Sequence, residues 1–181
     1  SLRIRKNSLY ERLFLPRLDG IICLTEPQRR LFTERYPDTP SVLAPSGLLR
    51  VERGTKRREN RVCYVGSLDP HKGMGTVLQA LAASGDESLG LLVIGGRNER
   101  EMRDFMDFAS LMGVGERVRI TGWVHHSDIG HMMDGCIAGI VPLADTPYNR
   151  HITSPLKILD CFSRCLPVIG ADLPSVRFYV E

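Results

Sequence analysis

Short apolar runs alternate with longer amphipathic segments at regular spacing from residue 61 to the end of the chain. Runs of this length between helical segments are typical of buried strands in a parallel sheet with right-handed crossover helices. The pattern therefore predicts an α/β fold with a Rossmann-like parallel sheet of order 3-2-1-4-5 and helices on both faces. The expected strands cover residues 62–65, 91–94, 118–121, 136–141 and 166–169, and residues 142–153 are expected to form a loop.

The junctions after four of these strands carry glycine or proline: Gly66, Gly95-Gly96, Gly122 and Pro142. In a sheet of this order, the carboxyl ends of the first and fourth strands border a ligand crevice. Small residues there favour a nucleotide crevice, although glycine is common in any such turn. No G-x-G-x-x-G follows the first strand and no G-x-x-x-x-G-K-[ST] is present. These absences argue against a standard NAD or FAD site and against a P-loop.

The stretch of residues 149–170 predicts a phosphate site. Ser154 is expected to be an N-cap and Pro155 the first residue of a mostly apolar, buried helix. A buried helix start presents free N–H groups and the positive end of the helix dipole to an anion. Asp160 would lie about 9 Å further along the axis, within reach of the ribose of a nucleoside diphosphate. In the plainer interpretation, three side chains form a polar stripe that faces water: Lys157, Asp160 and Arg164.

The first 60 residues differ in composition from the rest of the chain. They predict a basic helix over 2–17, a strand over 20–25, a helix over 27–36 with Thr25 as its cap and a short strand over 41–44. A charged, glycine-containing stretch follows up to residue 60, and this shift marks a domain boundary. We therefore expect 1–48 to belong to a preceding domain, 49–60 to be a linker and 61–181 to be the second domain.

Composition excludes several classes of protein. No apolar run is long enough to cross a bilayer, no signal peptide is visible, and Ser1 suggests a fragment. The cysteines are odd in number and lie in apolar settings, which favours reduced core thiols in a cytoplasmic protein. No ligand set for a metal is apparent. The five positions are Cys23, Cys63, Cys136, Cys161 and Cys165.

The net charge of +3 is unevenly distributed, with basic clusters over residues 3–17 and 50–61. These clusters are either solvated faces or a peripheral contact with an anionic membrane surface. Nucleic-acid binding is not expected, because no recognition motif or aromatic platform accompanies the basic residues.

Four blocks, in order, resemble the nucleotide-binding domain of GT-B glycosyltransferases, most closely family 4. They read V-C-Y-V-G-S-L-D-P-H-K-G-M-G-T-V-L-Q-A-L, L-L-V-I-G-G, V-R-I-T-G-W-V and S-P-L-K-I-L-D-C-F-S-R-C-L-P-V-I-G. The match spans residues 62–176, and residues 1–48 resemble the end of the preceding, acceptor-side domain. The resemblance implies the C-terminal half of a GT-B fold, truncated at its C-terminus.

The resemblance also implies roles for single residues. Lys72 stands where the family's loop lysine contacts the diphosphate, and Ser67 replaces an arginine that often follows the loop glycine. The family's paired glutamates fall on Ile152 and Asp160, so only the second carboxylate is preserved. Lys72 and Asp160 are the candidate catalytic residues. Donor-binding candidates are Gly66, Ser67, Lys72, Gly95, Gly122, Val124, Arg150, Ser154, Pro155, Leu156, Lys157 and Asp160.

The implied function is that of a retaining glycosyltransferase of hexosyltransferase type. It would transfer a sugar from a nucleotide-diphosphate donor to a sugar, lipid or polyprenyl-linked acceptor in polysaccharide or glycolipid synthesis. No cofactor or metal is expected, because charge that develops on the leaving diphosphate can be stabilised by protein N–H groups and cations. The isolated chain is expected to be inactive. The alternatives are a non-catalytic nucleotide-binding or interaction module, and a sugar-nucleotide epimerase or a phosphorylase on the same architecture.

Overall fold

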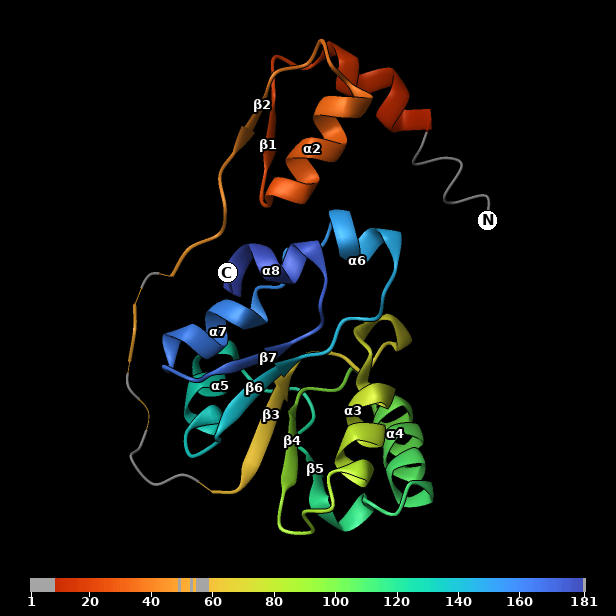
Figure 1. The fold of residues 1–181 in the computed structure, drawn as a ribbon, viewed down its shortest axis with the longest axis vertical. Coiled ribbons are helices and arrows are strands. Elements are labelled where there is room, and N and C mark those ends of the chain that lie inside the picture. The colour runs from red at the N-terminus through yellow and green to blue at the C-terminus, as the bar shows by residue number, and fades with distance from the viewer. Residues whose placement is uncertain (1–8, 49, 53, 55–58, 181) are drawn as a thin grey trace.

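The computed structural model describes residues 9–48, 50–52, 54 and 59–180. A five-stranded, fully parallel sheet lies at the centre of the larger part of the molecule (Figure 1). Its order is β5-β4-β3-β6-β7, which confirms the predicted order 3-2-1-4-5. The strands are β3 (Arg61–Val65), β4 (Gly90–Ile94), β5 (Val118–Ile120), β6 (Ala138–Val141) and β7 (Val168–Gly170).

Helices cover both faces of this sheet, as predicted. On one face lie α3 (Met74–Ala83) and α4 (Glu99–Leu111), and on the other α5 (His126–Met133) and α7 (Lys157–Ser163). The short 3-10 turn η2 (Pro70–Lys72) precedes α3, and the short 3-10 turn η3 (Gly115–Arg117) precedes β5. The chain then reaches α8 (Pro174–Val180).

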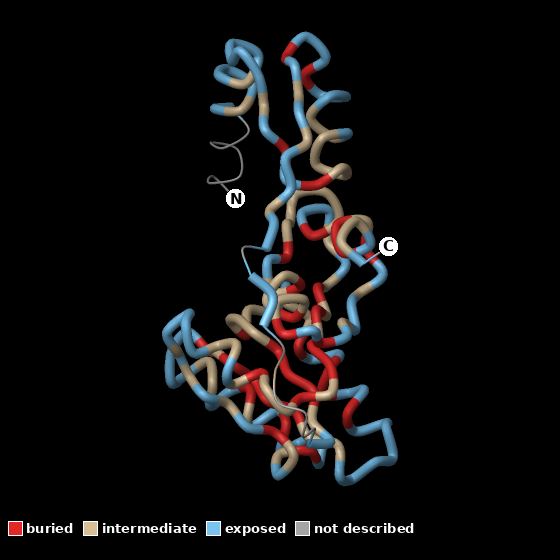
Figure 2. Tube along the Cα trace, turned by 90° about the vertical axis from the view of Figure 1, so that its left-hand side faces the viewer, coloured by how far each residue is buried: buried red, intermediate tan, exposed pale blue. Residues whose placement is uncertain are grey.

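Alternate residues of the inner strands belong to two separate hydrophobic cores, because successive side chains of a strand point to opposite faces of the sheet. Tyr64 packs in the layer of α3 and α4, together with Leu78 and Phe105. Its neighbour Cys63 packs in the layer of α5 and α7, together with Cys161. Figure 2 shows the buried residues concentrated along this part of the molecule.

A smaller unit precedes the five-stranded sheet. Residues 9–14 are helical and continue into η1 (Leu15–Arg17), while the part of the predicted helix over residues 2–8 lies outside the described residues. A separate parallel pair follows, β1 (Ile21–Cys23) and β2 (Ser41–Leu43), connected by α2 (Glu26–Arg35). The hydroxyl of Thr25 caps α2 by accepting the N–H of Gln28 at 3.3 Å, which confirms the predicted cap. Among the helices of the described ranges, none has the length and hydropathy needed to cross a bilayer.

The predicted linker is attached to the end of α7. Glu52 donates its N–H to the carbonyl of Ser163 at 2.7 Å, and its carboxylate pairs with Arg164 at 2.9 Å. Arg164 also pairs with Asp134 at 2.6 Å. This guanidinium therefore connects the segment before β3 to two elements on one face of the sheet.

Two details of the prediction are wrong. Residues 142–153 were expected to be a loop, yet α6 (Pro147–His151) forms within them because Thr146 accepts the N–H of Asn149 at 3.1 Å. Cys165 is exposed, not in the core, because it occupies the left-handed position that ends α7, with a φ of 55°. The other four cysteines are buried free thiols, as expected.

Candidate functional site

Three of the predicted glycine junctions meet at the carboxyl edge of the sheet. Gly66, Gly95 and Gly122 all have positive φ, of 136°, 134° and 74°. Gly95 bridges Gly122, and a Cβ on Gly95 would overlap the carbonyl of Gly66. Backbone packs directly against backbone here, so position 95 requires glycine. These three junctions also bring the carboxyl ends of β3, β4 and β5 together.

The loop that carries Lys72 is held against the end of β6. Lys72 ends the turn η2 and is followed by Gly73, whose φ is 76°. A Cβ on Gly73 would overlap the carbonyl oxygen of Pro142, so that only glycine allows this approach. Ala144 also donates its N–H to the carbonyl of His71 at 3.1 Å. Lys72 is thereby fixed at the crevice between the first and fourth strands of the sheet.

Lys157, the first residue of α7, places its ammonium group inside the same crevice. Its Nζ is buried and has no hydrogen-bond partner among the described residues. The nitrogen lies 4.0 Å from the centroid of the Tyr64 ring and would be 3.1 Å from a Cβ on Gly66. Gly66 therefore leaves the room that this ammonium group occupies.

Burial, reinforced by the positive charge of Lys72, lowers the pKa of Lys157 to about 7. The positive charge of Lys72 thus acts on Lys157 at the carboxyl edge of the sheet, and no residue that the structure describes forms a hydrogen bond with the ammonium group of Lys157. Buried charges are normally paired. An anion that binds between Lys72 and Lys157 would supply the missing partner.

The start of α7 differs from the prediction. The helix begins at Lys157, not at Pro155, and no side chain caps it. Ser154 is wrong as an N-cap, because its hydroxyl is hydrogen-bonded to the hydroxyl of Tyr179 at 2.7 Å. Pro155 is buried and Leu156 is exposed. Asp160 consequently lies in the first turn of α7, closer to the helix start than expected.

Asp160 is half-buried, and its carboxylate makes no hydrogen bond or ion pair with any other residue that the structure describes. Burial raises its pKa, while His126 and Lys157 act in the opposite direction. It lines a cleft of about 210 Å³ between α5 and α7, together with His126 and Arg164. The polar stripe considered from the sequence does not face water, since Arg164 is 9% exposed and Nζ of Lys157 is buried.

Other predicted residues are placed less favourably for a ligand. The hydroxyl of Ser67 donates to Asp69 at 2.8 Å. Arg150 forms an ion pair with Asp145, so its charge already has a partner. Val124 packs on the core beside α5, whereas its neighbour Trp123 is 79% exposed.

Three residues at this edge were not identified from the sequence. Tyr64 lies beneath Lys157, and Arg97 pairs with Asp69 in the Lys72 loop at 2.7 Å. Asn149 is buried between that loop and the segment before α7. Arg97 follows directly after Gly95-Gly96, and this spacing was the available signal for it.

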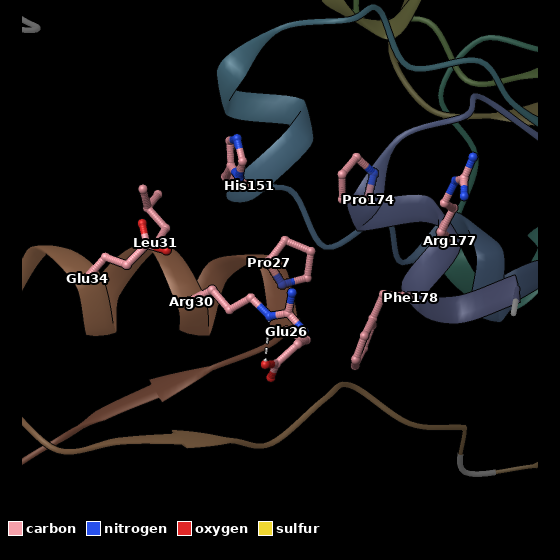
Figure 3. Close-up of a pocket in the computed structure, with 9 residues that line it drawn as sticks. All are labelled: Glu26, Pro27, Arg30, Leu31, Glu34, His151, Pro174, Arg177 and Phe178. Atoms are coloured by element: carbon pink, nitrogen blue, oxygen red, sulfur yellow. Dashed lines mark hydrogen bonds and ion pairs between the residues drawn. The ribbon is translucent and has the colours of Figure 1, made fainter.

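Another cavity lies away from this edge. It has a volume of about 550 Å³ and lies between α2 on one side and α6 and α8 on the other (Figure 3). Both arginines that line it have carboxylate partners, Arg30 with Glu26 and Arg177 with Asp172. It therefore fits a diphosphate less well than the crevice at the carboxyl edge. Within the described ranges, no group of three His, Cys, Asp or Glu side chains is arranged to hold a metal ion.

The fold and the crevice can be compared with known proteins. The model of the family described as glycosyl transferases group 1 matches residues 59–181. The chain belongs to this family. As in GT-B glycosyltransferases, its group 1 domain is an α/β unit with a parallel sheet. No curated protein matches the chain in sequence.

Solved structures share the fold of this chain at low sequence identity. Sucrose-phosphate synthase from Thermosynechococcus elongatus has a TM-score of 0.77 at 22% identity, over 94% of this chain and 45% of that one. HepE from Anabaena, in a complex with UDP and glucose, has a TM-score of 0.71 at 15% identity, over 88% and 46%. WaaG, a glycosyltransferase involved in lipopolysaccharide biosynthesis, has a TM-score of 0.69 at 19% identity, over 89% and 46%. The chain thus spans less than half the length of these proteins.

Proposed function

We propose that this chain is the donor-binding part of a retaining hexosyltransferase that uses a nucleotide-diphosphate sugar. Residues 61–181 would form the donor domain, residues 1–48 the end of the acceptor-side domain and 49–60 the linker. The acceptor would be a sugar, a lipid or a polyprenyl-linked molecule in polysaccharide or glycolipid synthesis. A peripheral contact of the full-length protein with the cytoplasmic membrane face belongs to the same proposal.

One observation carries this proposal: the buried Nζ of Lys157 has no hydrogen-bond partner among the described residues, and the Lys72 loop is held at the same edge of the sheet. Two cations of this kind suit the paired charges of a diphosphate. The lysines would bind the two phosphates, with backbone groups of residues 154–157 nearby. Negative charge grows on the diphosphate as the sugar leaves, so cations fixed beforehand stabilise the transition state more than the ground state.

The other groups at this edge suit the rest of a nucleotide. Asp160 has a carboxylate without a hydrogen-bond partner in the described residues, and two ribose hydroxyls could donate to it. Gly95, Gly122 and Val124 would border the base, because the first two expose backbone at neighbouring strand ends.

Nucleotide binding can be tested by thermal unfolding of the chain with UDP, GDP and ADP. UDP is the first choice because HepE was solved with it. We expect at least one of them to raise the Tm and Asp160→Ala to abolish most of the shift. Asp107→Ala, which removes an exposed carboxylate on α4, is the matched control and should keep the shift. No shift with any of these nucleotides would contradict the proposal.

A second candidate function is a nucleotide-binding module without catalysis. The pairing of Arg150 with Asp145, and the presence of Ser67 and Ile152 in place of charged residues, favour it. Release of sugar from UDP- and GDP-sugars by the full-length protein distinguishes the two. Nucleotide binding without release or transfer of sugar would favour the module.

A further inference from the structure

Asn149 is the most fully hydrogen-bonded polar side chain near the crevice. It is 1% exposed, and it lies in α6. Its Nδ2 donates to the carbonyl oxygens of His71 at 2.9 Å and Ala144 at 2.8 Å. Its Oδ1 accepts the hydroxyl of Thr153 at 2.9 Å. An asparagine amide has two donor hydrogens and one acceptor oxygen, and each of these three groups has a partner here.

The backbone of Asn149 is bound as well. Its N–H donates to the hydroxyl of Thr146 at 3.1 Å, and its carbonyl accepts the hydroxyl of Ser175 at the start of α8. The residue is therefore fixed from both sides. Its amide cannot turn without breaking bonds that no water can replace in a buried position.

Two of the three partners of the amide, His71 and Thr153, belong to the segments that carry the lysines of the crevice. His71 directly precedes Lys72, and its carbonyl also accepts the N–H of Ala144. Thr153 lies four residues before Lys157, in the segment that leads into α7. One planar amide thus connects the Lys72 loop to the start of α7. These segments are about 80 residues apart in the sequence, and like charges on them repel each other.

We infer that Asn149 is a positioning residue, which holds the Lys72 loop and the start of α7 at a fixed separation so that both ammonium groups can bind one diphosphate. This inference rests on the proposed donor site. Asn149 touches neither phosphate itself. Its effect is pre-organisation, since the cost of bringing the two cations together is met during folding and not during binding.

The test compares the affinity of the chain for UDP and for UMP, measured by calorimetry. UDP can engage both lysines, whereas UMP lacks the second phosphate. Asn149→Asp keeps the volume and the acceptor for Thr153 but turns a carboxylate oxygen towards two carbonyls. We expect it to weaken UDP binding by about tenfold or more and UMP binding by much less. Asn149→Ala should likewise weaken UDP binding more than UMP binding.

Two further variants keep the test decisive if Asn149 variants fail to fold. Thr153→Val removes the bond of the hydroxyl to Oδ1 of Asn149, together with its longer contact of 3.5 Å to the carbonyl of Tyr148, and should lower the UDP-to-UMP affinity ratio. Thr153→Ser retains a hydroxyl and should restore it. Asn60→Ala is the matched control: its amide also makes two hydrogen bonds, to Asp86 and Ser88, but at the opposite edge of the sheet. It should leave the ratio unchanged.

The possible results separate the two proposals. Wild-type chain that binds none of UDP, GDP or ADP would overturn the donor site itself. Wild-type chain that binds UDP, with an unchanged UDP-to-UMP ratio in the Asn149 and Thr153 variants, would overturn only the positioning role. An equal loss of UDP and UMP affinity in these variants would also overturn it, because a purely structural asparagine predicts that result.

Discussion

The ammonium nitrogen of Lys157 lies 4.0 Å from the centroid of the Tyr64 ring. A cation over an aromatic face is attracted by the ring quadrupole, by about 0.5–2 kcal/mol depending on desolvation. The ring is itself fixed, because its hydroxyl donates to the carbonyl of Ser67 at 2.6 Å. The contact compensates part of the cost of burying a charge. No group in the described residues accepts a hydrogen bond from this ammonium.

Replacing Lys157 with methionine should separate stability from binding. Lys157→Met removes a buried charge and keeps the aliphatic stem, so we expect the free chain to become more stable by about 1 kcal/mol or more. Charge-assisted hydrogen bonds contribute about 1.5–3 kcal/mol each, so affinity for UDP should fall by about 10- to 100-fold. Urea unfolding and calorimetry measure the two effects.

Lys72→Met is the comparison variant. Lys72 is only half-buried, so its loss should weaken UDP binding without a comparable gain in stability of the free chain. Unchanged UDP affinity in Lys157→Met would remove this residue from the donor site.

Stability should depend on pH through Lys157. Burial and then Lys72 lower its pKa to about 7, against the weaker opposing effects of Cys161 and Asp160 on the same helix. The unfolded chain keeps this proton up to about pH 10.4. Between these values the folded chain binds fewer protons, so the free energy of unfolding should rise with pH. Urea unfolding at pH 6.5 and 8.5 measures this rise, and Lys157→Met should lack it. An equal rise in this variant would assign the effect to other groups.

Much of the fold could be predicted because local patterns and tertiary packing agree. The period of two along β3, with Cys63 and Tyr64 on opposite faces, requires helices on both sides of the sheet. The glycine after β3, β4 and β5 and the proline after β6 mark where the chain turns. The sequence does not predict the helix α6, because it contains only five residues and its Thr146 cap and Pro147 are residue types that also occur in loops.

The site was harder to predict because it depends on contacts between distant segments. Sequence alone suggested Ser154 as a cap, but it could not show that Tyr179, 25 residues later, binds the same hydroxyl. Asn149 had no local signal, since its partners near Lys72 are about 80 residues away. The sequence identified Lys157 as a donor-binding candidate because its backbone lies at the expected helix start. The burial of its ammonium group follows from Gly66 and Tyr64 on another strand.

Gly66 should tolerate no side chain. Gly66→Ala would force an L-residue to a φ of 136° and place a Cβ 3.1 Å from Nζ of Lys157. We expect a loss of about 1–3 kcal/mol in stability and weaker UDP binding. Gly47→Ala is the matched control, because a Cβ there meets no atom within 4 Å. Thermal unfolding of both variants tests the difference, and equal stabilities would contradict a strained Gly66.

Glycine in place of Cys165 should stabilise the chain. Cys165 closes α7 with a φ of 55°, in a turn where its N–H bonds Phe162 and the N–H of Leu166 bonds Cys161. This left-handed position costs an L-residue about 1–2 kcal/mol, which glycine avoids while losing more chain entropy on folding. The net gain expected for Cys165→Gly is about 0.5–1 kcal/mol, or a rise of about 1–4 °C in Tm. Cys165→Ala removes the same thiol but keeps Cβ, so it should give no such rise. If both variants shifted the Tm equally, the thiol and not the backbone conformation would be responsible.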